Sequence, residues 1–180
     1  MTKKIVITGG IGYIGTELCK IYSGISWNDE ILVIDNRFVS ERVNQLRDWR
    51  IDFVHGDILN KDLVNKYCKD ADIVHHLAGI TDVPRLKSES NDEKDAKIKL
   101  VAEKGTQNIL DVISSKCKII FPSTHVVYEG IEKIKNDILE DEHAKPLLSY
   151  AVSKAINEKQ LKNSGKNYII LRLGSVYGYS

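Results

Sequence analysis

The chain has 180 residues, 42% of them hydrophobic and 28% charged, which is ordinary for one globular domain with a substantial core. Its 26 Lys and Arg residues offset 25 Asp and Glu residues to a net charge of +1, which excludes an overall field that attracts nucleic acid or an anionic membrane. No apolar run approaches a membrane span, and the run near the N-terminus is too short for a signal peptide core. We therefore predict a single domain over residues 1–180 that binds neither nucleic acid nor membrane.

The cysteines and the paired histidines give no indication of a metal site. Cys19, Cys68 and Cys117 stand far apart, without the paired spacing of metal ligands, so we expect buried free thiols, as suits a reducing cytoplasm. His75 and His76 are adjacent in an apolar stretch, and neighbouring residues of a strand face opposite ways. Both are therefore expected to be structural, and no metal is predicted.

The first predicted elements are a strand, a glycine-rich turn and a helix. An apolar run at residues 5–7 leads into glycines that fit both the Gly-x-Gly-x-x-Gly and the Gly-x-x-Gly-x-x-Gly spacing. Glycine allows a tight turn and a close approach of the backbone to a ligand, while the helix directs free N–H groups and a positive dipole end at the turn. This arrangement favours a bound pyrophosphate, with contacts expected from Gly9, Gly12, Tyr13 and Ile14.

A second apolar strand, at residues 31–34, ends in Asp35, twenty residues beyond Gly15. The helix before it is predicted to pack through Ile14, Leu18, Ile21 and Tyr22. An acidic side chain at this place can accept hydrogen bonds from the adenosine ribose hydroxyls, and it repels a 2′-phosphate. NAD is therefore the predicted cofactor, with Asn36 as a further contact.

Arg37 leaves an alternative open at the same loop. An arginine here can contact a 2′-phosphate and so indicate NADP. Because Asp35 precedes it, we favour NAD and interpret Arg37 as a solvated charge or as a lid that stacks on the adenine.

A third strand is expected at residues 51–55, after a short helix at 41–49, and is followed by Asp57 and Ile58. Asp57 can accept a hydrogen bond from the adenine amino group while Ile58 packs on the ring. Asp57 can equally be a simple turn or helix-cap residue. The sequence favours neither interpretation.

A fourth strand, at residues 73–77, follows a short helix at 61–68 and ends in small residues. Ligands of open α/β sheets bind at the carboxyl edge of the strands. We therefore predict that the cofactor lies over Leu77, Ala78 and Gly79.

The rest of the chain continues the alternation of strands and helices. In order, we expect a polar loop at 81–92, a long helix at 92–115, a strand at 118–121 ended by Pro122, a loop at 129–145, a helix at 148–162 and a strand at 167–173. This order predicts an α/β fold with a doubly wound parallel sheet and helices on both faces.

A candidate catalytic pair lies on the helix at 148–162. Tyr150 and Lys154 are four residues apart, so they share one helix face. A nearby Lys⁺ together with a positively charged nicotinamide can lower a tyrosine pKa from about 10 toward neutrality, which general acid/base catalysis requires. Thr124, after the fifth strand, offers a hydroxyl that can bind the reacting oxygen of a substrate.

These motifs together resemble the extended branch of the short-chain dehydrogenase/reductase family, which includes nucleotide-sugar epimerases and dehydratases. The matching segments run the whole length of the chain in family order: 8–15 (TGGIGYIG), 35–36, 56–58, 76–79, 105–110, 122–124, 127–128, 150–154 (YAVSK) and 171–178 (LRLGSVYG). The resemblance implies a Rossmann fold with NAD as cofactor. It also implies Tyr150 as acid/base, Lys154 as its activator and ribose ligand, and Thr124 as the third member, with Ser123 as the fallback.

The sequence departs from the family pattern in three places. Dehydratases of the family place Asp-Glu directly after the catalytic Thr, where this chain has His125 and Val126. Ala102 stands where relatives often carry an Asn. The chain also ends soon after Tyr177, where relatives continue into a smaller substrate domain, so we expect most of that domain to be missing here.

The resemblance implies an NAD-dependent oxidoreductase that acts on a nucleotide-sugar, and the missing Asp-Glu pair favours a sugar epimerase over a dehydratase. The alternatives are a dinucleotide-binding or redox-sensing module without catalysis, and a nucleotide-sugar dehydratase or reductase. Relatives also dimerise through two long helices, which correspond here to those at 92–115 and 148–162.

Overall fold

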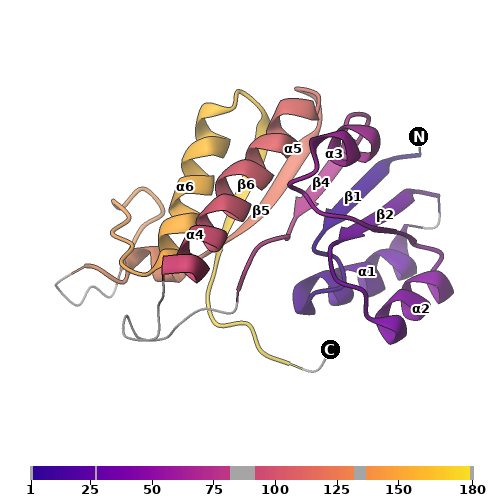
Figure 1. The fold of residues 1–180 in the computed structure, drawn as a ribbon, viewed down its shortest axis with the longest axis horizontal. Helices are drawn as coiled ribbons and strands as arrows, with labels where there is room; N and C mark the ends of the chain where they lie inside the picture. Colours follow the sequence, from indigo (N-terminus) through magenta and orange to yellow (C-terminus); the bar gives the residue numbers. More distant parts are fainter. Residues whose placement is uncertain (1, 27, 82–91, 132–136, 179–180) are drawn as a thin grey trace.

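Six parallel strands form one sheet in the computed structural model, which describes residues 2–26, 28–81, 92–131 and 137–178 (Figure 1). The strands are β1 (Lys4–Thr8), β2 (Glu30–Asp35), β3 (Asp52–His55), β4 (Ile73–His76), β5 (Lys118–Thr124) and β6 (Asn167–Leu173). Their order across the sheet is β3-β2-β1-β4-β5-β6, so the chain winds outward in one direction from β1 and in the other from β4. This is the doubly wound α/β sheet that the sequence predicted.

Helices cover both faces of the sheet (Figure 1). The first face carries α1 (Tyr13–Ile25) and α2 (Ser40–Asp48), and the second carries α3 (Lys61–Cys68), α4 (Asp92–Leu100), α5 (Thr106–Val112) and α6 (Ser149–Asn163). Side chains of the strands alternate between the two layers: Ile5 and Ile7 pack with α1 and α2, while Val6 packs with α3 and α5. The two cores explain why the strands are almost continuously apolar.

The inner side of α1 differs from the predicted one. Ile14 is 37% exposed and Ile21 is 57% exposed, whereas Thr16 and Cys19 are buried. The prediction was right for Leu18 and Tyr22, which pack against the core, and wrong for Ile14 and Ile21. The helix follows a tight turn, and the approach of Gly15 to the Gly10 backbone sets which side of it faces the sheet. The small residues therefore pack against the strands.

The long helix predicted at 92–115 is divided by a π-helical turn at Val101–Gly105, between α4 and α5. Two side chains of α6 donate hydrogen bonds to carbonyl oxygens of this turn: Asn157 to Ala102 at 2.8 Å and Gln160 to Glu103 at 2.9 Å. Such bulges leave helix carbonyls without their usual partners. Here the neighbouring helix supplies the donors.

Strand β5 continues through Pro122 instead of ending there. It pairs with β4 only as far as Ile120, but with β6 as far as Thr124. Proline has no N–H to donate, so it is poorly tolerated in a strand that is paired on both sides. Pro122 lies beyond the last residue of β5 that pairs with β4, where β5 pairs with β6 alone. The additional residues carry Ser123 and Thr124 to the carboxyl edge of the sheet.

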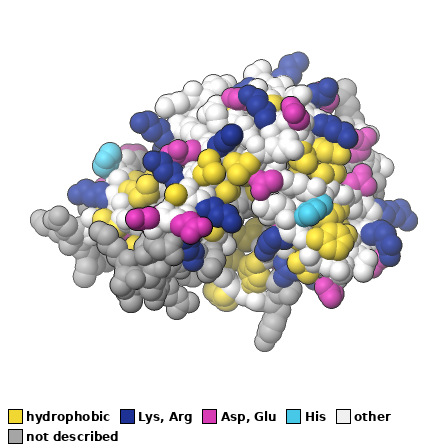
Figure 2. All heavy atoms as spheres, in the orientation of Figure 1, with side chains coloured by type: hydrophobic (Ala, Val, Ile, Leu, Met, Phe, Trp, Pro, Cys, Tyr) yellow, Lys and Arg dark blue, Asp and Glu magenta, His cyan; other side chains and the backbone are white. Residues whose placement is uncertain are grey.

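The other loop predictions fall partly outside the described residues. The loop expected at 81–92 is described only at its two ends, and of the loop at 129–145 the described part contains neither helix nor strand. Basic and acidic side chains are interspersed over the face seen in Figure 2. Among the described residues, no helix has the length and apolar character needed to cross a membrane.

We predict that Gly9→Ala destabilises the fold by about 2 to 4 kcal/mol. Gly9 has a φ of +72°, and an added Cβ would lie 2.7 Å from the backbone nitrogen of Ala78. Gly24→Ala in α1 is the matched control, because a Cβ there meets nothing within 4 Å and a helix favours alanine. Urea unfolding followed by circular dichroism measures both variants, and equal unfolding free energies would contradict the argument.

Candidate active site

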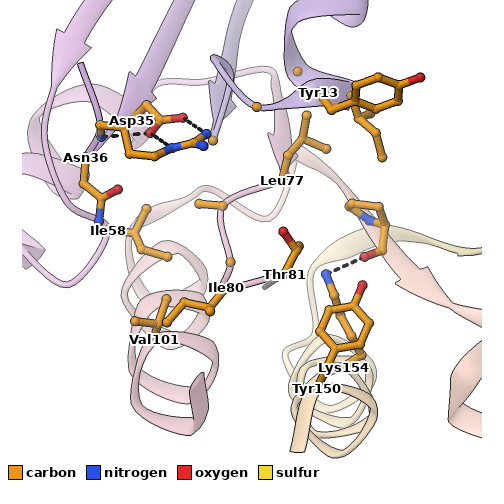
Figure 3. A pocket seen from close by; sticks show the side chains of 18 of the residues that line it. Tyr13, Asp35, Asn36, Ile58, Leu77, Ile80, Thr81, Val101, Tyr150 and Lys154 are labelled. Atoms are coloured by element: carbon orange, nitrogen blue, oxygen red, sulfur yellow. Dashed lines mark hydrogen bonds and ion pairs between the residues drawn. The ribbon is translucent and has the colours of Figure 1, made fainter. Parts of the chain in front are cut away.

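A cavity of about 1120 Å³ opens at the carboxyl edge of the sheet, where the chain leaves β1 and β4 in opposite directions. Figure 3 shows Asp35 and Ile58 at one end of it and Tyr150 and Lys154 at the other. Every site residue predicted from the sequence lines it: Gly9, Gly12, Tyr13, Ile14, Asp35, Asn36, Asp57, Ile58, Leu77, Ala78, Gly79, Ser123, Thr124, Tyr150 and Lys154. The topology thus brings together segments from the whole chain.

The glycine-rich turn forms one wall of the cavity. Gly9 lies directly against the backbone of Leu77 and Ala78, and its carbonyl accepts a hydrogen bond from the Gly12 N–H at 3.0 Å. Helix α1 then begins at Tyr13, with no acidic residue in its first turn. Its N-terminus, with the positive end of the helix dipole, therefore faces a cavity into which no carboxylate of that turn projects.

Asp35 is only 4% exposed at the end of β2 and holds the turn in place. Its Oδ2 accepts from the Ile11 N–H at 3.3 Å, and its Oδ1 accepts from the Arg37 N–H at 3.0 Å. The Arg37 guanidinium adds one contact to each oxygen, from Nε at 3.3 Å and from Nη2 at 3.4 Å. Figure 3 draws dashed lines from the Asp35 carboxylate to those partners that are among the residues shown.

Asp57 has the turn role that the sequence left open. Its Oδ1 accepts from the Leu59 N–H at 2.8 Å, and its Oδ2 accepts from the Asn36 amide at 3.0 Å. The two polar residues predicted for the adenine end thus bind each other across the ends of β2 and β3. Ile58 is buried beside them and packs on Gly105, where a Cβ would lie 2.4 Å from the Ile58 side chain.

Tyr150 and Lys154 extend from α6 into the cavity (Figure 3). The Lys154 ammonium donates to the Pro122 carbonyl at 2.8 Å and lies 4.6 Å from the Phe121 ring centre and 5.7 Å from that of Tyr150. Burial lowers the pKa of Lys154 to about 8. Burial also raises the pKa of Tyr150, so Lys154 alone does not bring the phenol toward neutrality.

The two hydroxyls at the end of β5 have different partners. Thr124 Oγ1 accepts from the Val126 N–H at 3.2 Å, which leaves the hydroxyl proton available for another acceptor. Ser123 Oγ instead donates to Glu158 Oε1 at 2.6 Å. Although burial acts to raise it, hydrogen bonds from Arg172 and Ser123 hold the pKa of Glu158 below its ordinary value.

Histidines 75 and 76 face opposite sides of the sheet, as predicted. The His75 ring bonds to the Tyr22 hydroxyl at 2.7 Å, and His76 bonds to Thr8 and Thr106 on the other side. Burial lowers the pKa of His75 to about 4, so its ring is neutral near pH 7. In the described part of the chain, no group of three potential metal ligands comes together.

The family model described as "NAD dependent epimerase/dehydratase family" matches residues 5–180. The chain belongs to that family. This confirms the resemblance drawn from the sequence motifs.

Two curated relatives and one solved structure illustrate the similarity. The chain is 30% identical to CDP-paratose 2-epimerase of Salmonella typhi, with 97% of this chain and 58% of that protein covered. It is also 30% identical to dTDP-D-glucose 4,6-dehydratase of Dictyostelium discoideum, with coverage of 98% and 44%. The structure of UDP-glucuronic acid 4-epimerase from Bacillus cereus in complex with NAD has a TM-score of 0.79 at 28% identity, covering 97% of this chain and 57% of that one. The chain thus spans about half the length of these relatives.

In this member of the epimerase/dehydratase family, an ion pair between buried Glu158 and partly buried Arg172 was not found from the sequence. Arg172 of β6 binds Glu158 of α6 at two points, at 2.9 and 2.6 Å, and also bonds to the Tyr128 hydroxyl. Glu158 lies one helical turn beyond Lys154. The spacing of Tyr150, Lys154 and Glu158 on one helix face could have indicated a third polar partner, but nothing local identifies Arg172 as its counterion.

We predict that Lys154→Met changes how stability depends on pH. Between pH 8 and 10.5, the folded wild type has lost the Lys154 proton while the unfolded chain retains it, so rising pH favours the folded state. Relative to the variant, wild-type stability should rise by about 3 kcal/mol across this window. Parallel urea titrations from about pH 7 to about pH 11 measure the difference. If the difference in unfolding free energy between wild type and variant did not change with pH, the result would contradict the buried, cationic position of Lys154.

Proposed function

We propose that the protein is an NAD-dependent epimerase that acts on a nucleotide-sugar. The observation that carries this proposal is one cavity with a glycine-rich turn and Asp35 at one end and Tyr150, Lys154 and Thr124 at the other. A dinucleotide is long enough to connect the two ends. The relatives named above include an epimerase and a dehydratase named for nucleotide-sugars and an epimerase in complex with NAD.

The residues of the cavity fit NAD. Backbone N–H groups at the start of α1 suit the pyrophosphate, and the oxygens of Asp35 suit the adenosine ribose. Ile58 and Val101 give the adenine end an apolar lining, and the Lys154 ammonium suits the nicotinamide ribose. The carboxylate of Asp57 can accept from the adenine amino group in addition to its two present donors, because an ionised carboxylate has about four acceptor sites.

In the proposed reaction, Tyr150 accepts the proton of a sugar hydroxyl, and Thr124 donates a hydrogen bond to the same oxygen. The chemistry that NAD supplies when bound is reversible acceptance of a hydride from the carbon that carries this hydroxyl. Loss of the proton and the hydride converts this carbon of the sugar into a ketone. Return of the hydride to the opposite face of the ketone inverts the configuration at that carbon. Tyr150 then returns the proton.

Positive charge is what Tyr150 needs to act as the base. Burial raises its pKa, so Lys154 must act with a second cation. A positive charge about 5 Å from the phenol oxygen, at an effective dielectric near 20, contributes about 3 kcal/mol, or roughly two pKa units. The positive charge on the nicotinamide ring of NAD⁺ would lower the pKa of Tyr150 by this amount. NADH lacks that charge, so the pKa would be lowered only when the cofactor is oxidised.

An epimerase is favoured over a dehydratase by the surroundings of Thr124. Elimination of water needs an acid near the site, and His125 and Val126 follow the threonine directly. The His125 ring donates from Nδ1 to the Leu173 carbonyl at 3.1 Å, and His125 does not line the cavity. A binding module without catalysis is the second candidate, favoured by the raised pKa of Tyr150, since a protonated phenol does not accept a proton.

Two further proposals concern assembly and location. We propose a homodimer through the helices at 92–112 and α6, since Leu100 on α4 is 50% exposed. We propose a cytoplasmic location, because all three cysteines are free and buried.

We predict that Tyr150→Phe lowers kcat at least about a thousandfold in the natural full-length product while NAD binding changes less than about threefold, because only the proton acceptor is lost. Turnover is measured with a panel of UDP-, GDP-, CDP- and dTDP-sugars, and NAD binding by calorimetry. Unchanged turnover would remove Tyr150 from the mechanism. Tight NAD binding with no reduction by any sugar would favour the binding module.

We predict that Thr124→Val and Ser123→Ala separate a catalytic hydroxyl from a structural one. Thr124→Val should lower kcat about a hundredfold, because its hydroxyl proton is available to the substrate oxygen, and should cost about 1 kcal/mol of stability, because the Val126 N–H loses its acceptor. Ser123→Ala should mainly lower the unfolding free energy, by about 1 to 3 kcal/mol, because it removes a buried donor from Glu158. A larger loss of kcat in Ser123→Ala would reverse the assignment and make the fallback residue the catalytic one.

A further inference from the structure

The ribose end of the cavity has an acceptor that is already fully used. Asp35 receives two hydrogen bonds on each carboxylate oxygen: from the Ile11 N–H and Arg37 Nη2 on Oδ2, and from the Arg37 N–H and Nε on Oδ1. An ionised carboxylate offers about four acceptor sites. A ribose diol therefore cannot bind Asp35 without displacing a donor.

The donors that can leave are those of the Arg37 side chain. The two backbone N–H groups are fixed by the turn and by the end of β2, whereas the Arg37 side chain is 59% exposed. Its contacts of 3.3 and 3.4 Å are at the long end of the hydrogen-bond range, and an ion pair with one exposed partner is weak. Displacement of the guanidinium is therefore easy, and it leaves a cation directly beside the ribose.

The position of the Arg37 guanidinium determines which group of a ligand it can contact. Arg37 Nη2 lies over the glycine-rich turn, 3.5 Å from the point where a Gly12 Cβ would stand, and both Arg37 and Arg42 line the cavity. Arg42 donates hydrogen bonds to the Ile11 carbonyl and to Thr16, which hold it in place. Of these two arginines, Arg37 is therefore the one whose side chain can move to contact a ligand. A planar guanidinium pairs well with a phosphate.

We propose that Arg37 sets the coenzyme selectivity of this site: it covers Asp35 in the free protein and, once displaced by the ribose, offsets the repulsion between Asp35 and a 2′-phosphate. The site then binds NAD and also tolerates NADP. This inference rests on the dinucleotide site proposed above.

The test compares the dissociation constants of NAD and NADP by calorimetry for the 180-residue chain and three variants. The wild type should bind NADP within about tenfold of NAD, and Arg37→Gln should raise the ratio of the NADP to the NAD constant at least about tenfold, chiefly by weakening NADP. Arg37→Lys keeps the charge but loses the two-point geometry, so its ratio should lie between these values. Arg47→Gln is the matched control, since Arg47 is exposed on α2, outside the cavity lining, and its loss changes the net charge equally.

Salt provides a second measurement. Added salt should weaken NADP binding more than NAD binding in the wild type, and this difference should disappear in Arg37→Gln. If NAD binds and the ratio is the same in the wild type, Arg37→Gln and Arg37→Lys, the inference about Arg37 is overturned while the proposed cofactor site stands. If neither dinucleotide binds the wild type, the proposed function itself fails, and with it the inference.

Discussion

The close approach of two backbone segments, Gly9 after β1 and Leu77–Ala78 after β4, is the constraint on which the rest of the site depends. These neighbouring strands lead in opposite directions, so the crevice between them is where a ligand can reach the sheet edge. No side chain fits at Gly9, because a Cβ would lie within 2.9 Å of the Ala78 and Leu77 backbone. Because Gly9 has no side chain, nothing projects from this residue into the crevice.

A buried polar chain fixes the two segments relative to each other. Thr8 Oγ1 contacts the His76 ring at 2.9 Å and accepts from the Ala78 N–H at 3.3 Å, and His76 Nε2 contacts Thr106 Oγ1 at 2.9 Å. Burial, and then the charge of Lys154, lower the pKa of His76 to about 3, so the ring is neutral. A neutral imidazole satisfies both threonines as one donor and one acceptor, whereas a charged ring would add a second cation beside Lys154.

The sequence predicted the strands, and it selected residues that line one cavity, because both depend on local patterns. Apolar runs that end in small or acidic residues mark the carboxyl ends of parallel strands, and Asp35 and Ala78 follow this pattern. What it missed depends on distant partners. The π-helical turn at Val101–Gly105 accepts donors from α6, more than fifty residues away in the sequence, and the Glu158–Arg172 pair joins a helix to a strand across a connecting loop. The exposure of Ile14 could not be predicted from periodicity, because the turn before α1 sets the rotation of the helix.

The Glu158–Arg172 pair connects the stability of the fold to the geometry of the site. Glu158 is nearly buried and continues the helix face of Tyr150 and Lys154, while Arg172 binds it from β6 and reaches the Tyr128 hydroxyl. Ser123, the neighbour of Thr124, is attached to the same carboxylate. Glu158 is buried and Arg172 is partly buried, so removal of Arg172 would leave a buried carboxylate without its counterion, at a cost of up to about 3 to 5 kcal/mol. The pair therefore holds α6 and the end of β5 in one arrangement. Within the described residues Lys154 has no such counterion, so its burial next to a carbonyl and an aromatic ring opposes folding. The proposed acid/base role of Tyr150 accounts for that cost, because a cation beside the phenol would support it.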